Sequence, residues 1–126
     1  MKHIIIKKRI EPYNLIEGVK KYYTVEDYTF KGIDKFGILE NFILKLNELQ
    51  KTNVAFGLYM KNVNKFYLAY SDEKINELKE NLNKKVIDNI LEITDDNVND
   101  IIYTDSRDEA LSAIDMGKAE ASIIIS

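Results

Sequence analysis

The sequence predicts an α+β protein in which helices pack on a mixed β-sheet, in a single domain that spans residues 1–126. Two stretches carry this prediction: a β-hairpin at about 53–71 and a C-terminal strand–helix–strand (βαβ) unit at about 101–126. In both stretches apolar residues recur at every second position, as in strands, or at every third and fourth, as in helices. A chain of 126 residues can bury one such core without disulfides or metals.

The first part of the chain is expected to form a strand, a helix and a second strand. A β-branched run predicts a strand over 4–10, and the step from Glu11 to Pro12 ends it. Because proline suits the first turn of a helix, we expect a helix at about 12–22. Alternating polar and apolar residues then predict a strand with one solvated face over 24–30.

The strongest amphipathic helix is predicted at about 36–50. A wide apolar stripe of this kind is typical of a helix that packs on a core, and less typical of a groove for a partner. The stripe consists of Ile38, Leu39, Phe42, Ile43, Leu46 and Leu49.

The predicted hairpin joins two apolar strands across a short polar turn. Asn62 and Asn64 tolerate the left-handed backbone conformation that such a turn needs. We expect the apolar set of the first strand, which begins at Val54, to meet the set of the second strand, which begins at Phe66, on one core face. Gly57 lies inside the first strand, where an isolated glycine indicates a bulge or a close approach of another group to the backbone.

Between the hairpin and the C-terminal unit, the stretch 71–92 carries two apolar stripes at helical spacing, which predict two helices or one bent helix. The acidic loop that follows opens with the residue spacing of an EF-hand calcium loop. Asp100 and Ser106, however, stand where that loop needs glycine and glutamate. A polar loop is therefore the preferred interpretation, and no calcium site is expected.

The C-terminal unit is the clearest structural signal in the sequence. Ser106 and Glu109 have the spacing of a capping box, and Gly117 suits the left-handed residue that ends a helix. Two strands joined through a helix should run parallel, with a right-handed crossover. A helix start can also bind an anion, but Asp105 and Asp108 crowd this one with negative charge, so plain capping is preferred.

Composition excludes several classes of function. The chain has no cysteine, which excludes disulfides and thiol chemistry. No apolar run approaches the ~20 residues of a membrane span, and the N-terminal residues do not form a signal peptide. We therefore expect a cytoplasmic protein without a membrane partner. The net charge of −3 and the lack of an arginine cluster argue against a nucleic-acid partner.

His3 is the only histidine in the chain. A single histidine without cysteine cannot build a zinc site, because zinc requires several nitrogen or sulfur ligands. As a residue near the terminus it is expected to be exposed. The chain has no glycine-rich phosphate loop and no nucleophile elbow, so we assign no catalytic residue, no metal and no cofactor.

Several segments together are similar to one protein family: IIIKKRI, AFGLYMKNVNKFYLAYSD and the run from KKVIDN to ASIIIS. The chain resembles the C-terminal portion of an uncharacterised bacterial and archaeal family, whose longer members begin with a ParB-like segment. Those members carry a His-Arg pair where Lys8 and Arg9 stand, so only Arg9 carries over. They also carry an upstream Asp-Gly-His-His-Arg stretch that this chain lacks. The resemblance therefore implies a domain that is inactive alone.

Two function hypotheses follow. The first is a non-catalytic accessory domain that binds a small ligand or a protein partner. The alternative is part of an enzyme that binds a nucleotide or phosphorylated metabolite together with a missing ParB-like N-terminal domain. Arg9 and Arg107, the only two arginines, are the candidate residues for binding a small anionic ligand. Surface salt bridging is their simpler interpretation, and the enzymatic hypothesis requires both to converge with an acid on one pocket.

A further hypothesis is self-association. The terminal strand ending in IIIS, if it lies at a sheet edge, would offer unpaired backbone groups to the same strand of a second copy. The sequence thus leaves a homodimer through an edge strand as an open alternative.

Overall fold

The computed structural model describes residues 2–71 and 100–125. The helical stretch expected after the hairpin, and the acidic loop that follows it, fall outside these residues except at their ends. The elements are β1 (His3–Ile6), α1 (Pro12–Lys20), β2 (Thr24–Thr29), α2 (Lys35–Leu49), β3 (Val54–Met60), β4 (Lys65–Ser71), β5 (Ile101–Thr104), α4 (Arg107–Asp115) and β6 (Ala121–Ile124).

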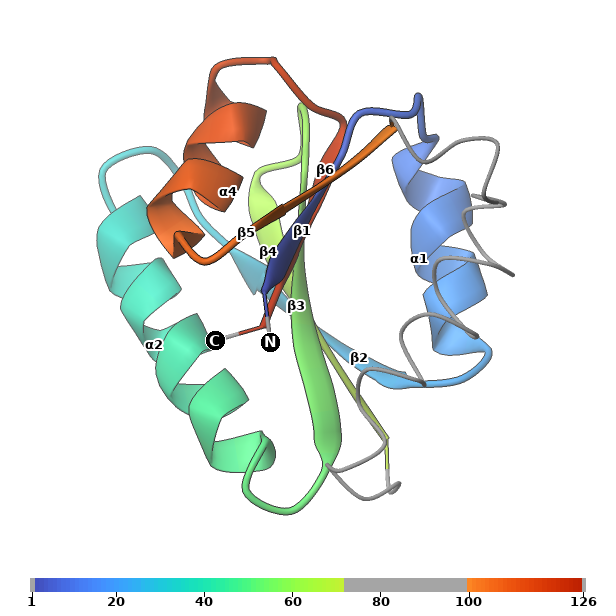
Figure 1. Cartoon of the computed structure of the whole chain (residues 1–126). Coiled ribbons are helices and arrows are strands. Elements are labelled where there is room, and N and C mark those ends of the chain that lie inside the picture. The colour runs from blue at the N-terminus through green and yellow to red at the C-terminus, as the bar shows by residue number, and fades with distance from the viewer. Residues whose placement is uncertain (1, 72–99, 126) are drawn as a thin grey trace.

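The six described strands form one open sheet in the order β2-β4-β3-β6-β1-β5. Helices α2 and α4 cover one face of this sheet, and α1 lies on the other (Figure 1). The apolar side chains accordingly gather in two clusters, one toward α1 and one toward α2 and α4. The α+β class is confirmed, and β3 and β4 form the predicted hairpin. No helix among residues 2–71 and 100–125 has the length and apolar character of a membrane span.

Every pairing between the described strands is antiparallel. Strands β5 and β6 each run antiparallel to β1, so they run parallel to one another, as two strands joined through a helix should. They are not neighbours, because β1 lies between them. The parallel ladder that a mixed sheet implies is therefore absent from the described strands. The reason is that β1, buried at every position, supplies a partner for both.

The place of β6 corrects one expectation. This strand lies inside the sheet, with hydrogen-bonded ladders to β1 on one side and β3 on the other. It offers no unpaired edge to a second copy, so the condition on which the hypothesis of a homodimer through this strand depends is not met. Among the described strands the two edges of the sheet are β2 and β5.

The register of the hairpin also differs from expectation. The β3 set that begins at Val54 packs toward α1, whereas the β4 set that begins at Phe66 packs on the opposite face, toward α2. The ladder pairs Leu58 with Tyr67 and Tyr59 with Phe66, so the two sets do not meet. All of β3 is buried, so apolar residues occupy both of its faces. Alternation in the sequence then cannot identify a single core face or fix the register.

Gly57 provides the close approach that its place in a strand indicates. A Cβ atom on Gly57 would lie 2.2 Å from Cζ of Phe42, whose ring therefore packs against the bare backbone of β3. The same ring stacks on Phe66, with ring centroids 5.3 Å apart. Because Gly57 has no side chain, helix α2 can pack close to the sheet at this point.

The start of α4 is capped as predicted, with one added participant. Ser106 Oγ accepts a hydrogen bond from the backbone N–H of Glu109 at 3.1 Å. The Glu109 carboxylate does not return to Ser106; it accepts from the Thr104 hydroxyl at 2.9 Å, and Thr104 Oγ1 accepts from the Ser106 N–H at 3.1 Å. The reciprocal bond of the capping box is thus relayed through Thr104. Gly117 has φ +71°, the left-handed conformation expected after the helix.

The remaining elements follow the sequence prediction closely, except for the first strand. Proline begins α1. Helix α2 buries three residues of its predicted stripe and partly buries the other three, Ile38, Leu39 and Leu49. Asn62 adopts the left-handed conformation in the hairpin turn, with φ 65°. The predicted strand over 4–10 is shorter, because β1 leaves the sheet after Ile6 with one last bond from the Lys7 N–H to the Asp100 carbonyl at 2.8 Å. Of the charged residues that follow, Lys7 and Arg9 are exposed.

Candidate functional site

Two neighbouring depressions flank the β3–β4 turn at one end of the sheet, and both are lined by Lys61, Asn62 and Val63. The first, the α4 depression, has a volume of about 390 Å³, and its other lining residues are Phe30, Tyr59, Met60, Asn64, Ile114, Asp115 and Gly117. The second, the Arg9 depression, has a volume of about 500 Å³, and its other lining residues are Arg9, Ile10, Glu11, Pro12 and Glu120.

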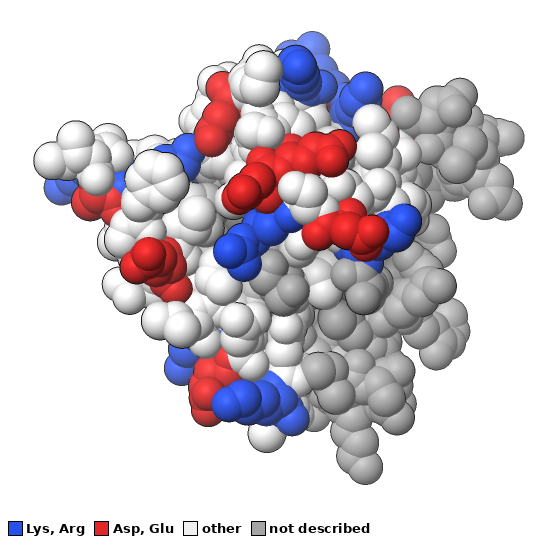
Figure 2. All heavy atoms as spheres, turned by 60° about the vertical axis from the view of Figure 1, so that its left-hand side comes forward, with Lys and Arg blue, Asp and Glu red and all other residues white. Residues whose placement is uncertain are grey.

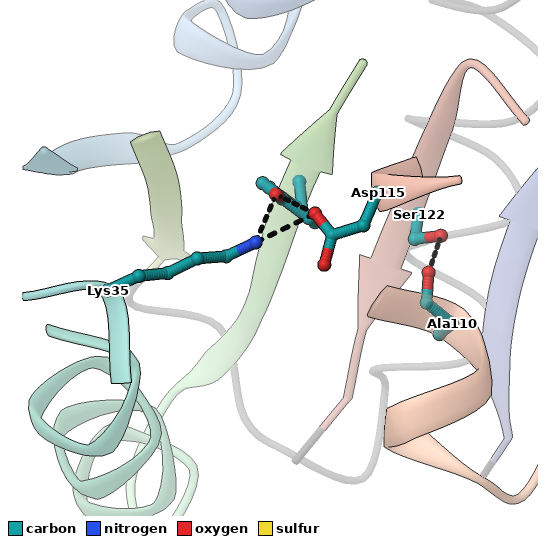
Figure 3. Close-up of polar contacts among 5 residues, drawn as sticks. Lys35, Ala110, Asp115 and Ser122 are labelled. Carbon is teal, nitrogen blue, oxygen red and sulfur yellow. Dashed lines mark hydrogen bonds and ion pairs between the residues drawn. The ribbon is translucent and has the colours of Figure 1, made fainter. Parts of the chain in front are cut away.

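A polar cluster of three side chains borders the α4 depression. Lys35, the first residue of α2, places its ammonium 2.7 Å from Asp115 Oδ1 and 2.9 Å from the Tyr59 hydroxyl (Figure 3). The Tyr59 hydroxyl itself donates to the same carboxylate oxygen. The cluster therefore ties the start of α2 to the end of α4 across the central strand β3.

Two aromatic rings complete the surroundings of the Lys35 ammonium. Its nitrogen lies 5.1 Å from the ring centroid of Tyr59 and 5.3 Å from that of Phe30. Both distances are within the range over which the negative face of an aromatic ring attracts a cation. The side chains of Lys35 and Asp115 are 30% and 43% exposed, so the ion pair lies at the rim of the protein rather than in its core.

The protonation states of this cluster follow from its contacts. Burial alone would lower the pKa of Lys35, but the hydrogen bonds from its ammonium to Asp115 and Tyr59 and the negative charge of Asp115 raise it above its usual value. Burial, followed by the bond to Asp115, raises the pKa of Tyr59, and the nearby Lys35 offsets part of that rise. Near neutral pH, Lys35 is therefore a cation and Tyr59 a neutral phenol.

In the Arg9 depression, backbone hydrogen bonds of Glu120 connect the end of β1 to the residue after β3. The N–H of Glu120 donates to the Ile6 carbonyl at 2.9 Å, and the Glu120 carbonyl accepts from the Lys61 N–H at 3.0 Å. The Glu120 carboxylate also binds the Lys61 ammonium at 3.2 Å, with both side chains largely covered. Arg9 is exposed and makes no salt bridge with any residue in the described part of the chain. Its guanidinium is the cation of this depression that is not already paired.

The two arginines singled out by the sequence do not come together. Arg9 follows the carboxyl end of β1. The ladder pairs His3 with Thr104, so Arg107, which comes shortly after Thr104, lies at the amino end of β1. Only Arg9 borders one of the two depressions at the β3–β4 turn. Neither of these two depressions is the shared pocket with both arginines that the enzymatic hypothesis requires.

His3 is buried, contrary to the expectation of an exposed terminal residue. Its side chain is 5% exposed, and its Nδ1 accepts a hydrogen bond from the Ile125 N–H at 3.0 Å. Burial lowers the pKa of His3, and the positive charges of Arg107 and the N-terminus lower it further. The expectation failed because β1 lies inside the sheet, which places the start of the chain in the core.

The polar cluster was missed by the sequence analysis. Lys35, Tyr59 and Asp115 come from three elements and have no fixed spacing, and each has an ordinary surface or strand interpretation on its own. The only local signal is that Tyr59 breaks the otherwise apolar face of β3 that packs on α2. Such a break indicates a buried hydroxyl with a partner, but it does not identify that partner.

Charge on the face with α2 and α4 is mixed. Figure 2 shows lysines and acidic residues interspersed there, with no broad patch of one sign. In the described part of the chain, no group of three or more acidic or histidine side chains is placed to hold a metal ion.

Comparisons with family models, curated proteins and solved structures gave no match to the chain. The fold and site thus define an α+β domain with two surface depressions at one end of its sheet.

Proposed function

We propose that the chain is a non-catalytic binding domain that takes a small anionic ligand in the Arg9 depression. The observation that carries this proposal is the guanidinium of Arg9, which has no salt-bridge partner among residues 2–71 and 100–125. It borders a depression of about 500 Å³, a volume within the usual range for small-molecule sites. A guanidinium presents a planar pair of donors that suits a carboxylate or phosphate group.

The rest of the depression restricts which anions fit. Glu11 and Glu120 also line it, and Lys61 is already bound to Glu120. Two carboxylates near one free cation disfavour a highly charged ligand. The proposed ligand class is therefore a singly charged organic anion, such as a carboxylate, that also offers hydrogen-bond donors to the glutamates.

The titratable groups of the polar cluster support a binding role over catalysis. General acids and bases work best with a pKa near the operating pH. The pKa values of Lys35 and Tyr59 are both raised, so each moves further from neutrality. His3 is buried, and its Nδ1 is engaged by the Ile125 N–H. In the described residues these groups hold the fold together and are not poised to transfer protons to a ligand.

The resemblance to the C-terminal portion of the ParB-linked family is consistent with this proposal, as is a cytoplasmic location. In that setting the domain is accessory, and any chemistry belongs to another part of a larger protein. The enzymatic alternative is less favoured, because Arg9 and Arg107 lie at opposite ends of β1.

The proposal is tested by thermal-shift measurements with acetate, lactate, inorganic phosphate and adenosine monophosphate. We expect a hydroxylated monocarboxylate such as lactate to raise Tm more than phosphate does. The rise should disappear in Arg9→Ala and persist in the matched control Arg107→Ala, whose arginine lies at the other end of the strand. An equal response of the two variants, or no response to any of the four anions, would contradict the proposal.

A further inference from the structure

The surroundings of the Lys35 ammonium have the composition of a recognition site for an ammonium group. A carboxylate oxygen of Asp115 lies 2.7 Å from the nitrogen and the Tyr59 hydroxyl 2.9 Å from it. The rings of Tyr59 and Phe30 lie 5.1 and 5.3 Å away. Proteins that recognise quaternary ammonium ligands use such aromatic faces, and a carboxylate adds a charge-assisted hydrogen bond to a primary ammonium. Here the bound ammonium belongs to the protein itself.

The α4 depression gives solvent-borne molecules access to this place. Phe30, Tyr59 and Asp115, which surround the Lys35 ammonium, also line the depression. The contacts from Lys35 and Tyr59 both fall on Oδ1 of Asp115, and the second carboxylate oxygen points away from them (Figure 3). The other charged side chain in the lining, Lys61, is bound to Glu120 instead. Asp115 is therefore the one acidic side chain among the described residues that line the depression.

Lys35 is attached in a way that lets it leave. It is the first residue of α2 and follows a loop containing Gly32, with φ +76°. Its side chain is partly exposed, and a long flexible side chain gains conformational entropy when it moves into water. A rim ion pair of this kind contributes little net stability. The ammonium can therefore be replaced by another ammonium without disturbing the packed part of α2.

We propose that Phe30, Tyr59 and Asp115 form a binding site for the primary ammonium group of a small molecule, and that Lys35 occupies this site in the free protein as an internal competitor. The site is independent of the anion site beside Arg9. A ligand must displace Lys35 to enter, so the intrinsic affinity of the site is masked by the fraction of time that Lys35 spends in it.

The test uses n-butylammonium, which matches the end of a lysine side chain, and n-butanol, its uncharged analogue. Binding is followed by NMR shifts of the Phe30 and Tyr59 ring signals near neutral pH. Wild-type protein should bind n-butylammonium weakly. Lys35→Ala should bind it at least about tenfold more tightly, because the competitor is gone. Lys35→Ala should not respond to n-butanol at the same concentrations.

Two further variants make the test decisive. Adding Asp115→Asn to Lys35→Ala should abolish the gain in affinity for n-butylammonium. Lys51→Ala removes a lysine from an exposed ion pair with Glu48, just after the end of α2, and this variant should bind as wild type. Arg9→Ala should leave n-butylammonium binding unchanged, which separates this site from the anion site. If Lys35→Ala does not fold, Lys35→Met keeps the hydrocarbon stem and takes its place. Equal affinities in wild type and the Lys35 variant, or equal responses to both probes, would overturn the proposal.

Discussion

Ser122, in the middle of β6, donates a hydrogen bond of 2.7 Å to the backbone carbonyl of Ala110 in α4 (Figure 3). Both residues are completely buried. The hydroxyl therefore reaches from the sheet into the body of a helix, on the face of β6 that packs against Ala110. This bond fixes where α4 sits along β6, a position that apolar contacts alone would define less sharply.

Replacing this hydroxyl should be costly. Ser122→Ala removes the bond, and we expect the free energy of unfolding to fall by about 1–2 kcal/mol, the usual range for a buried hydrogen bond. Urea denaturation measures the change. Ser112→Ala is the matched control, because Ser112 also bonds a carbonyl of α4 but does so at the surface, and its loss should be close to neutral. Equal losses in the two variants would show that burial of the Ser122 hydrogen bond does not increase its contribution to the free energy of unfolding.

Gly57→Ala should destabilise the protein by at least about 2 kcal/mol. The reason is that the added Cβ would lie 2.2 Å from Cζ of the buried Phe42 ring. Gly37→Ala is the opposite control: no atom lies within 4 Å of its added Cβ, and alanine should stabilise α2 by about 0.5–1 kcal/mol. In a Phe42→Leu background, Gly57→Ala should cost less than in wild type. Additive effects of the two substitutions would contradict the contact.

Ser106→Ala should lower the free energy of unfolding by about 1 kcal/mol, the typical value of an N-cap. Thr104→Val should have a similar effect, since its hydroxyl links Ser106 to Glu109. Asp105→Ala is the control, because Asp105 lies next to the cap without serving as it. A larger loss in Asp105→Ala than in Ser106→Ala, measured by thermal or urea unfolding, would move the cap by one residue.

His3 should make stability depend on pH. The pKa of His3 is lowered in the folded protein, so the unfolded chain binds a proton first as the pH falls through about 6.5. The contribution of His3 is therefore fully present above this pH and is lost below it. We expect wild type to lose more stability than His3→Gln between about pH 7.5 and 5.5. Parallel pH profiles of the two proteins would refute this assignment.

How far the sequence predicts this fold depends on whether the information is local. Helix α2 and the cap at Ser106 follow from spacing within a few residues, and both were predicted. The hairpin was predicted too, but its register was not, because β3 is buried at every position and both of its faces pack against helices. Pairing of β1 with β5 and β6 joins segments from opposite ends of the chain, and no spacing rule reaches that far.

The candidate sites divide in the same way. Arg9 could be chosen from the sequence because arginine is scarce in this chain and its chemistry suits anions. Lys35 and Asp115 are 80 residues apart in the sequence, and no local pattern around either residue predicts their contact. The burial of His3 depends on the position of β1 in the sheet, which only the tertiary structure provides.

The position of β1 between β6 and β5 has a consequence for biosynthesis. Among the described strands β1 is synthesised before all others, yet its two partners, β5 and β6, are synthesised after all others. Its apolar isoleucines must remain without strand partners until β5 and β6 have been synthesised, and half of the sheet cannot form before then. Such long-range pairing slows folding, and it leaves an apolar, aggregation-prone strand exposed to other nascent chains. Chaperone dependence during synthesis is therefore expected to concentrate on this N-terminal strand.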